Sequence, residues 1–167
     1  MGKDFLSDHQ VVALFYPVAD AFVGGLTSDA ICLRDYRRIT FFVMTGAIED
    51  ADVSNIVTIE ACTAAAGTGH TAMEYHHRVC RSSTSVDTWG ALTASASTGY
   101  NFSDNNAVAN AMWAIEVTAD EVQAAVANAD FVRMAVAETE DKTITAAGFA
   151  ILSEPRYPGA VPLTAIA

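Results

Sequence analysis

Positively charged residues are scarce in this sequence. Nine Lys and Arg stand against 20 Asp and Glu in 167 residues, which gives a formal net charge of −11 at pH 7. The basic residues are scattered along the chain apart from Arg34, Arg37 and Arg38. No dense basic face is therefore expected to neutralise phosphates, and we predict no nucleic-acid partner.

Cysteine and long apolar runs are also scarce. The three cysteines, Cys32, Cys62 and Cys80, form an odd set without a CxxC spacing, and the opening residues MGKDFLSDHQ lack the charged-then-apolar pattern of a signal segment. These features predict reduced thiols and folding in the cytoplasm. No run approaches the roughly 18 apolar residues of a membrane helix, so we expect no membrane insertion.

Signatures of catalysis and of metal binding are missing as well. There is no G-x-S-x-G elbow, and the sequence 67–69 (GTG) lacks the third glycine, the lysine and the helix of a phosphate-binding loop. His70, His76, His77 and Cys80 could each ligate zinc, but a straight strand would spread them over about 33 Å and turn His77 to the opposite face. We expect no catalytic residue, no metal and no cofactor.

What the sequence does contain is apolar residues in short alternating runs. Hydrophobic residues make up 51% of the chain and charged residues 17%, which predicts that partner proteins cover some apolar surface. Period-two alternation, broken by Gly, Asn, Asp and Ser, predicts strands in the segments 38–44, 53–62, 70–80, 89–96, 111–118, 131–137 and 143–153. The fold class is therefore all-β, an antiparallel β-sandwich of the jelly-roll type.

Several pairings and faces follow from these segments. Segment 70–80 is expected to form a hairpin with 53–62, segments 111–118 and 131–137 to pair or neighbour each other, and 97–106 to form a loop. One face of each of four strands is expected to carry the following apolar residues: Ile39, Phe41 and Val43; Val57, Ile59 and Ala61; Trp113, Ile115 and Val117; Val132, Met134 and Val136. The last strand is expected to run through Ile144, Phe149 and Ile151. Thr118 and Glu121 have capping-box spacing, which predicts one short helix before Asn128.

The chain divides into three parts. Residues 1–19 are expected to form an N-terminal arm or first strand, 20–154 the sandwich, and 155–167 a C-terminal arm containing proline. Proline cannot donate to a central ladder, and the arm's apolar residues should dock on the parent domain or, as we favour, on a partner. These apolar residues of the arm are Tyr157, Val161, Leu163 and Ile166.

The cluster of Arg34, Tyr36, Arg37 and Arg38 is the one concentration of positive charge. These residues either form the solvated start of a strand or meet carboxylates on a neighbouring subunit, where guanidinium groups set the register. The predicted partner-binding residues are Arg34, Tyr36, Arg37, Arg38, Arg156, Tyr157, Val161, Leu163 and Ile166.

Five segments together resemble a known group of proteins. They are SDAICLRDYRRITFFVMTG (28–46), VTIEAC (57–62), MWAIEVTADEV (112–122), FVRMAV (131–136) and GFAILSEPRYPG (148–159). As a set they resemble small virion proteins of tailed bacteriophages that are encoded among the head genes, a group that includes capsid decoration, or cement, proteins. The resemblance implies a structural protein on the capsid exterior that bridges subunits of the major capsid protein.

We therefore expect a non-enzymatic protein that assembles with itself, as a dimer or trimer on symmetry axes, and with the major capsid protein. Two alternatives remain open from the sequence. One is another virion component, such as a head–tail connector, a tail protein or a head-fibre protein. The other is a β-barrel ligand-binding protein or metal-dependent enzyme that uses the segment 70–80.

Overall fold

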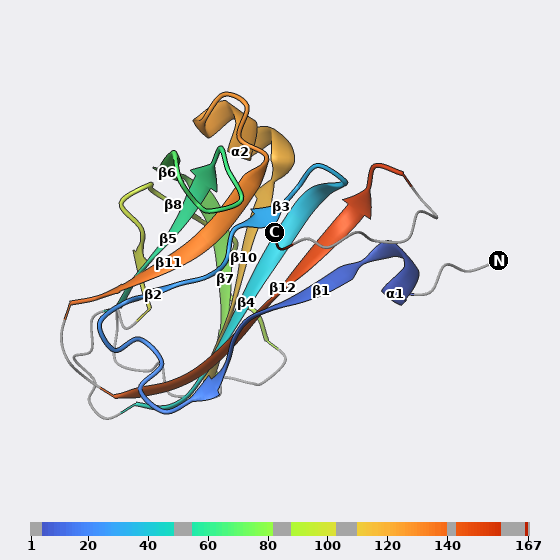
Figure 1. The fold of residues 1–167 in the computed structure, drawn as a ribbon. Coiled ribbons are helices and arrows are strands. Elements are labelled where there is room, and N and C mark those ends of the chain that lie inside the picture. Colours follow the sequence, from blue (N-terminus) through green and yellow to red (C-terminus); the bar gives the residue numbers. More distant parts are fainter. Residues whose placement is uncertain are drawn as a thin grey trace.

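Two antiparallel sheets pack face to face in the computed structural model, which describes residues 5–48, 55–81, 88–102, 110–139, 143–157 and 166 (Figure 1). Sheet A has the spatial order β1 (Gln10–Val18), β12 (Ile144–Pro155), β4 (Tyr36–Ile48), β10 (Ala111–Thr118), β7 (Tyr75–Arg81) and β8 (Thr93–Ser95). Sheet B has the order β2 (Leu26–Thr27), β11 (Phe131–Glu138), β5 (Asn55–Cys62) and β6 (His70–Met73). In addition, β3 (Ile31–Cys32) pairs with β11, and β9 (Tyr100–Asn101) pairs with β5.

The strand order confirms the predicted all-β sandwich and is that of a jelly roll. The order β1-β12-β4-β10 in sheet A faces the order β2/β3-β11-β5-β6 in sheet B, so that consecutive strands cross between the sheets. Strands β7 and β8 extend sheet A beyond this pattern. Two helices accompany the sheets, α1 (Phe5–Asp8) and α2 (Ala119–Ala125). No helix within the described ranges is long and apolar enough to cross a membrane.

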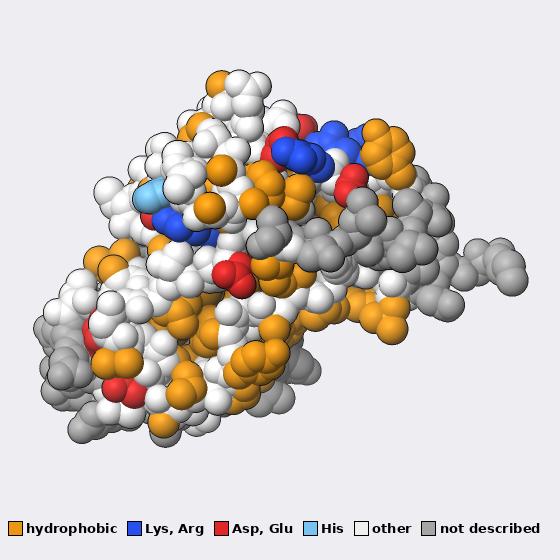
Figure 2. All heavy atoms as spheres, viewed as in Figure 1, with side chains coloured by type: hydrophobic (Ala, Val, Ile, Leu, Met, Phe, Trp, Pro, Cys, Tyr) orange, Lys and Arg blue, Asp and Glu red, His pale blue; other side chains and the backbone are white. Residues whose placement is uncertain are grey.

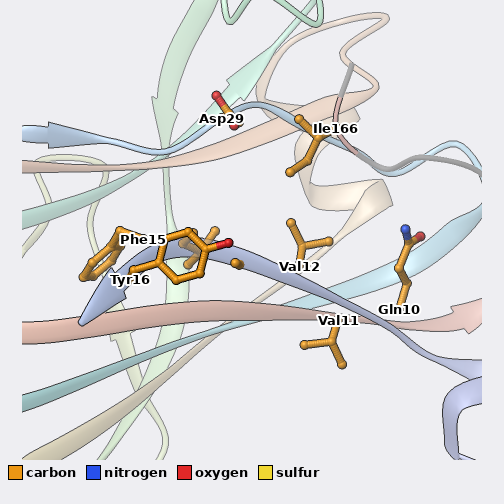
Figure 3. A pocket seen from close by; sticks show the side chains of 9 residues that line it. Gln10, Val11, Val12, Phe15, Tyr16, Asp29 and Ile166 are labelled. Atoms are coloured by element: carbon orange, nitrogen blue, oxygen red, sulfur yellow. The ribbon is translucent and has the colours of Figure 1, made fainter. Parts of the chain in front are cut away.

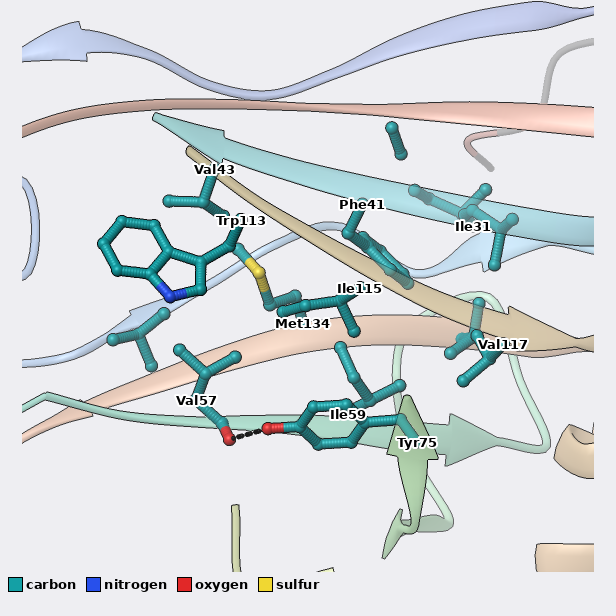
Figure 4. Packing of buried hydrophobic residues seen from close by; sticks show 14 of the residues in the cluster. Ile31, Phe41, Val43, Val57, Ile59, Tyr75, Trp113, Ile115, Val117 and Met134 are labelled. Carbon is teal, nitrogen blue, oxygen red and sulfur yellow. Dashed lines mark hydrogen bonds between the residues drawn. The ribbon is translucent and has the colours of Figure 1, made fainter. Parts of the chain in front are cut away.

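The core lies between the sheets and is built by the predicted alternation. Strand β10 has the burial pattern of a sandwich strand, with Trp113, Ile115 and Val117 buried and the residues between them half-buried. The same alternation buries Ile39, Phe41 and Val43 of β4, Val57, Ile59 and Ala61 of β5, and Val132, Met134 and Val136 of β11. Figure 4 shows several of these side chains, among them Phe41, Val57 and Trp113, meeting between the sheets. The predicted inward faces of these four strands are confirmed.

The segment 70–80 is not a simple hairpin partner of 53–62. Its first part, β6, does pair with β5, where His70 lies opposite Cys62. At Glu74 the chain bends and continues as β7 in the other sheet, next to β10. A strand that bends at a corner of a sandwich can belong to both sheets. Alternation alone does not reveal such a bend, because the inward faces of both halves point into the same core.

Strands β10 and β11 do not pair, contrary to the prediction, because they belong to different sheets. Helix α2 lies between them in sequence and carries the chain from sheet A to sheet B. Its start was predicted correctly. The Thr118 side chain accepts a hydrogen bond from the Glu121 backbone N–H, and the Glu121 carboxylate accepts one from the Thr118 N–H at 2.7 Å.

The predicted last strand is present as β12, and its apolar residues divide between the two faces. Ile144 is buried, and Ala146, Ala150 and Leu152 continue its face. Phe149 and Ile151 are half-buried and alternate to the outside of sheet A. The Phe149 ring stacks there on Phe42, with 5.1 Å between the ring centroids. The outer face of sheet A is thus apolar at its centre.

The segment 89–102 is less regular than the other predicted strands. Only Thr93–Ser95 of the predicted strand 89–96 joins sheet A, as β8, and Trp89 forms an isolated bridge with Cys80. The predicted loop 97–106 contains the two-residue strand β9, and residues 103–106 lie outside the described part of the chain. Gly99 precedes β9 with φ +93°, and a Cβ there would lie 2.5 Å from the Val57 carbonyl oxygen. This close approach requires glycine.

Candidate interaction surface

Two distant segments meet at one end of the sandwich and bring the predicted arginines together. Antiparallel pairing of β12 with β4 places Pro155 opposite Tyr36, and the Arg156 N–H donates to the Asp35 carbonyl at 2.8 Å. We call this region the arginine end, defined by Arg34, Arg37, Arg38 and Arg156. Figure 2 shows blue basic side chains gathered with red acidic ones at the upper right, near β3 and the end of β12 in Figure 1.

Arg38 joins three strands of sheet A. Its guanidinium forms ion pairs with Glu116 of β10 and, at 3.0 Å, with Glu154 near the end of β12. Partial burial opposes the charge of Arg38, but the two carboxylates outweigh this effect and raise its pKa. Glu154 reaches Arg38 from a left-handed backbone conformation with φ 58°. Arg38 is therefore engaged within the chain and has little capacity left for a partner.

Arg34 lies at the edge of a small hollow. Its Nε donates to Asp130 Oδ2 at 2.8 Å, and this hydrogen bond and the charge of Asp130 raise the pKa of Arg34. The guanidinium also lies over the Phe131 ring, 5.6 Å from its centroid. The hollow has a volume of about 260 Å³ and is lined by Leu33, Arg34, Ala119, Gln123, Ala129, Asp130, Arg156 and Tyr157.

The remaining groups at this end face solvent. Arg37 and Arg156 are exposed, and neither forms an ion pair with another described residue. Tyr157 is 69% exposed. The guanidinium groups of Arg37 and Arg156, which form no ion pair with another described residue, suit a partner that presents carboxylates. Guanidinium pairs with carboxylate through directed hydrogen bonds.

Tyr36 differs from its neighbours because it is buried in the core and only 5% exposed. Burial raises the pKa of its phenol, and the charge of Asp35 adds to this effect. Its side chain therefore contributes to the sandwich rather than to a surface, contrary to its place among the predicted partner-binding residues. Strict alternation along β4 would place Tyr36 on the same face as Arg38 and Phe42, opposite Ile39, so alternation does not account for its burial.

The end of the C-terminal arm returns to the parent domain. Ile166 forms an antiparallel bridge with Ile31 and is half-buried against the core. It lies over a groove of about 500 Å³ that runs along β1 and also includes Asp29. Figure 3 shows Ile166 and Val12 pointing toward each other, while Val11 points to the other side of β1. Val161 and Leu163 lie outside the described residues.

The histidines of the segment 70–80 are separated by the bend at Glu74. His76 is exposed and His77 buried, on opposite faces of β7 as expected, while His70 lies in sheet B. His77 Nδ1 is 2.8 Å from Ser95 Oγ, and its ring lies 4.1 Å from that of Tyr100. Within the described ranges, no group of three or more His, Cys, Asp or Glu side chains could hold a metal ion.

Sequence reasoning missed the acidic partners of the arginines and the outer face of sheet A. Asp130, Glu116 and Glu154 are distant from the arginines in sequence, and no local signal links them. The outer face had a signal in the run Ile39-Thr-Phe-Phe-Val-Met44, where apolar residues occupy both faces of the strand. A strand that is apolar on both sides is expected to be covered on both sides.

Comparisons with known proteins give one structural likeness. No protein-family model and no curated protein matches the sequence. The fold is similar to the crystal structure of the SPBc2 prophage-derived protein YomS, with 11% sequence identity and a TM-score of 0.42. The similarity covers 86% of this chain and 93% of that protein. A likeness this distant does not identify a function.

Proposed function

We propose that this chain is a non-enzymatic structural protein of a tailed-bacteriophage virion, a decoration protein that binds the outside of the head. In this role it stabilises contacts between subunits of the major capsid protein. The sequence resemblance supports the proposal. A surface suited to protein contact also supports the proposal. It is the structural observation on which the proposal depends.

That surface is the arginine end. Arg37, Arg156 and Tyr157 are exposed there, on two segments held together by strand pairing between β4 and β12. The rest of the chain is strongly acidic, with a net charge of −11. The positive charges of Arg37 and Arg156 at one end of an acidic protein would orient it toward an acidic surface on a partner. Charge complementarity guides both the encounter of two proteins and their alignment in the complex.

Arg37→Ser/Arg156→Ser tests this role without disturbing the fold. Both side chains are exposed and form no ion pair with another described residue. The double variant is expected to bind heads that lack the protein at least about tenfold more weakly, a loss of roughly 1.4 kcal/mol. Co-sedimentation with purified heads measures this affinity. Wild-type binding should weaken as salt rises, because exposed charges are screened.

Arg78→Ser is the matched control, because Arg78 is an exposed arginine on β7, away from the arginine end. It removes one positive charge from another part of the surface, as Arg37→Ser or Arg156→Ser does singly, and should leave head binding within about twofold of wild type. Equal losses in Arg78→Ser and in each single variant, Arg37→Ser or Arg156→Ser, would mean that net charge, not the arginine end, governs binding.

Electron microscopy of the native particle tests the role itself. A decoration protein is expected as many copies spread over the lattice of the head exterior, each touching neighbouring capsid subunits. A single ring of copies at the portal vertex would instead show a connector. Density confined to the tail or to fibres would show the corresponding component, and either result would refute a decoration role.

A further inference from the structure

The outer face of sheet A is apolar where an antiparallel sheet normally meets water. Six of its side chains form the centre of this face: Val11, Phe42, Met44, Met112, Phe149 and Ile151. Each alternates with a buried neighbour along its strand and points away from the core. Val11 is 51% exposed and Met44 49%. Antiparallel sheets usually carry polar residues on the face opposite the core.

The register shows that these side chains form one continuous surface. Val11 of β1 lies opposite Ile151 of β12, and Phe149 lies opposite Phe42 of β4. Met44 of β4 then lies opposite Met112 of β10. Cross-strand neighbours on one face lie about 5 Å apart, so their side chains touch. The apolar surface therefore extends without interruption over four strands.

The outer face of sheet B is different. Its centre carries the ion pair of Glu60 with Arg133, at 2.6 Å, and the half-buried Thr58. The centre of this face is therefore polar, although the Glu60 and Arg133 side chains are only 15% and 17% exposed. The apolar character is thus a property of sheet A and does not follow from the general composition of the chain.

Charge on this face favours a second copy of the chain as the occupant. Two copies of a protein with net charge −11 repel each other over most of their surfaces. On the outer face of sheet A the described carboxylates are Glu116 and Glu154 at its margin, and Arg38 pairs with both. Arg78, on β7 opposite Ala114, adds a positive charge to the same face. This is where two acidic molecules can meet with least repulsion.

The size of the face is also sufficient for a dimer. The four apolar strands together with β7, spaced by about 4.8 Å and with three rows of outward side chains about 6.8 Å apart, give roughly 500 Å² per copy. Two copies would cover about 1,000 Å² in total, the area that a specific interface needs. A flat apolar sheet face is complementary to itself, as a two-fold axis requires, and sheets stack face to face at about 10 Å.

We propose that two copies of this chain form a dimer by stacking the outer faces of sheet A across a two-fold axis. The centre of the interface is the stacked pair of Phe42 and Phe149, which packs against its equivalent. Met44 and Met112 fill the space around the rings, since unbranched thioether side chains adapt to irregular gaps. The dimer does not require the capsid, so the proposed function and this interface can fail separately.

Sedimentation equilibrium of the full chain in solution, without capsid, tests the dimer. Between about 1 and 100 µM the wild type is expected to reach twice the chain mass of 17.6 kDa. Ala114→Glu places a carboxylate between Phe42 and Arg78 at the centre of the face, where the dimer would bury it even when it pairs with Arg78. Because the two-fold axis introduces it twice, it should weaken dimerisation at least about 100-fold.

Ala135→Glu is the matched control. Ala135 is a half-buried alanine in the middle of β11, outward on sheet B and paired on both sides like Ala114. It should leave the dimer within about twofold of wild type. Met44→Lys at a 49% exposed position serves as a second disrupting variant that leaves the core untouched.

Three results would overturn the proposal. The first is a wild type that remains monomeric at every concentration. The second is a trimer, because face-to-face stacking closes with two copies. The third is a dimer that survives both Ala114→Glu and Met44→Lys, or that Ala135→Glu weakens equally.

Discussion

Arg38 and Arg37 are neighbours in sequence but differ in what their side chains do. The Arg38 guanidinium is one-third exposed and holds carboxylates from two other segments, whereas Arg37 points into solvent. The sequence places both residues in one basic cluster. Only the fold assigns one to internal ion pairing and leaves the other available for a partner.

Arg38→Ser should therefore destabilise the protein, and Arg37→Ser should not. We expect Arg38→Ser to lower the free energy of unfolding by about 0.5 to 1 kcal/mol, a modest value because water screens the partly exposed pairs. Urea denaturation measures the difference, with Arg37→Ser as the matched control. Equal midpoints for the two variants would show that the ion pairs of Arg38 add no stability.

His77 is a buried titratable group of β7. Burial lowers its pKa below the ordinary value of 6.5, and the nearby charge of His76 lowers it further. The folded state therefore binds the proton less readily than the unfolded state. The stabilising effect of the neutral ring is complete above the unfolded pKa and is lost as the pH falls from there to the folded pKa.

The melting temperature should accordingly fall as the pH drops from about 7.5 to about 5, before most carboxylates titrate. For a chain of this length each kcal/mol lost lowers it by about 2 to 4 °C. In His77→Gln this pH dependence should largely disappear, whereas His76→Gln, which changes the exposed neighbour, should retain most of it. A slope of wild-type size in His77→Gln would assign the effect to another group.

The secondary-structure elements follow closely from their local sequence patterns. Alternation identified the inward faces of β4, β5, β10 and β11, and the capping box identified the start of α2. These patterns reflect interactions between close neighbours in the chain, so sequence reveals them. The bend at Glu74, which divides one predicted strand between two sheets, has no comparable local signal.

Thr118→Ala tests the capping box of α2. The substitution removes the side chain that accepts from the Glu121 N–H, and the free energy of unfolding should fall by about 1 kcal/mol. Thr145→Ala, at a half-buried outward position of β12, controls for the loss of a threonine hydroxyl. Chemical denaturation compares the two variants. Equal losses would contradict a specific role for the cap.

At the scale of the whole molecule, two proposed contact surfaces occupy different positions. The arginine end lies where β4 begins and β12 ends, whereas the apolar face covers the centre of sheet A. A dimer formed through the sheet would leave Arg37 and Arg156 exposed. Each copy could then bind the head through its own arginine end, and paired binding would strengthen attachment through multivalency.

The sequence by itself determined the all-β class, the inward faces of the principal strands, the helix start and the acidic character of the chain. Each of these depends on residue identity or on neighbours within a few positions. Tertiary structure decided which strands pair, that Arg156 lies beside Asp35, and that Phe149 turns outward onto Phe42. Period-two alternation distinguishes the two faces of a strand but does not indicate which strands it pairs with. Where both faces are apolar, as in β4 and β12, only packing against the opposite sheet selects the buried one.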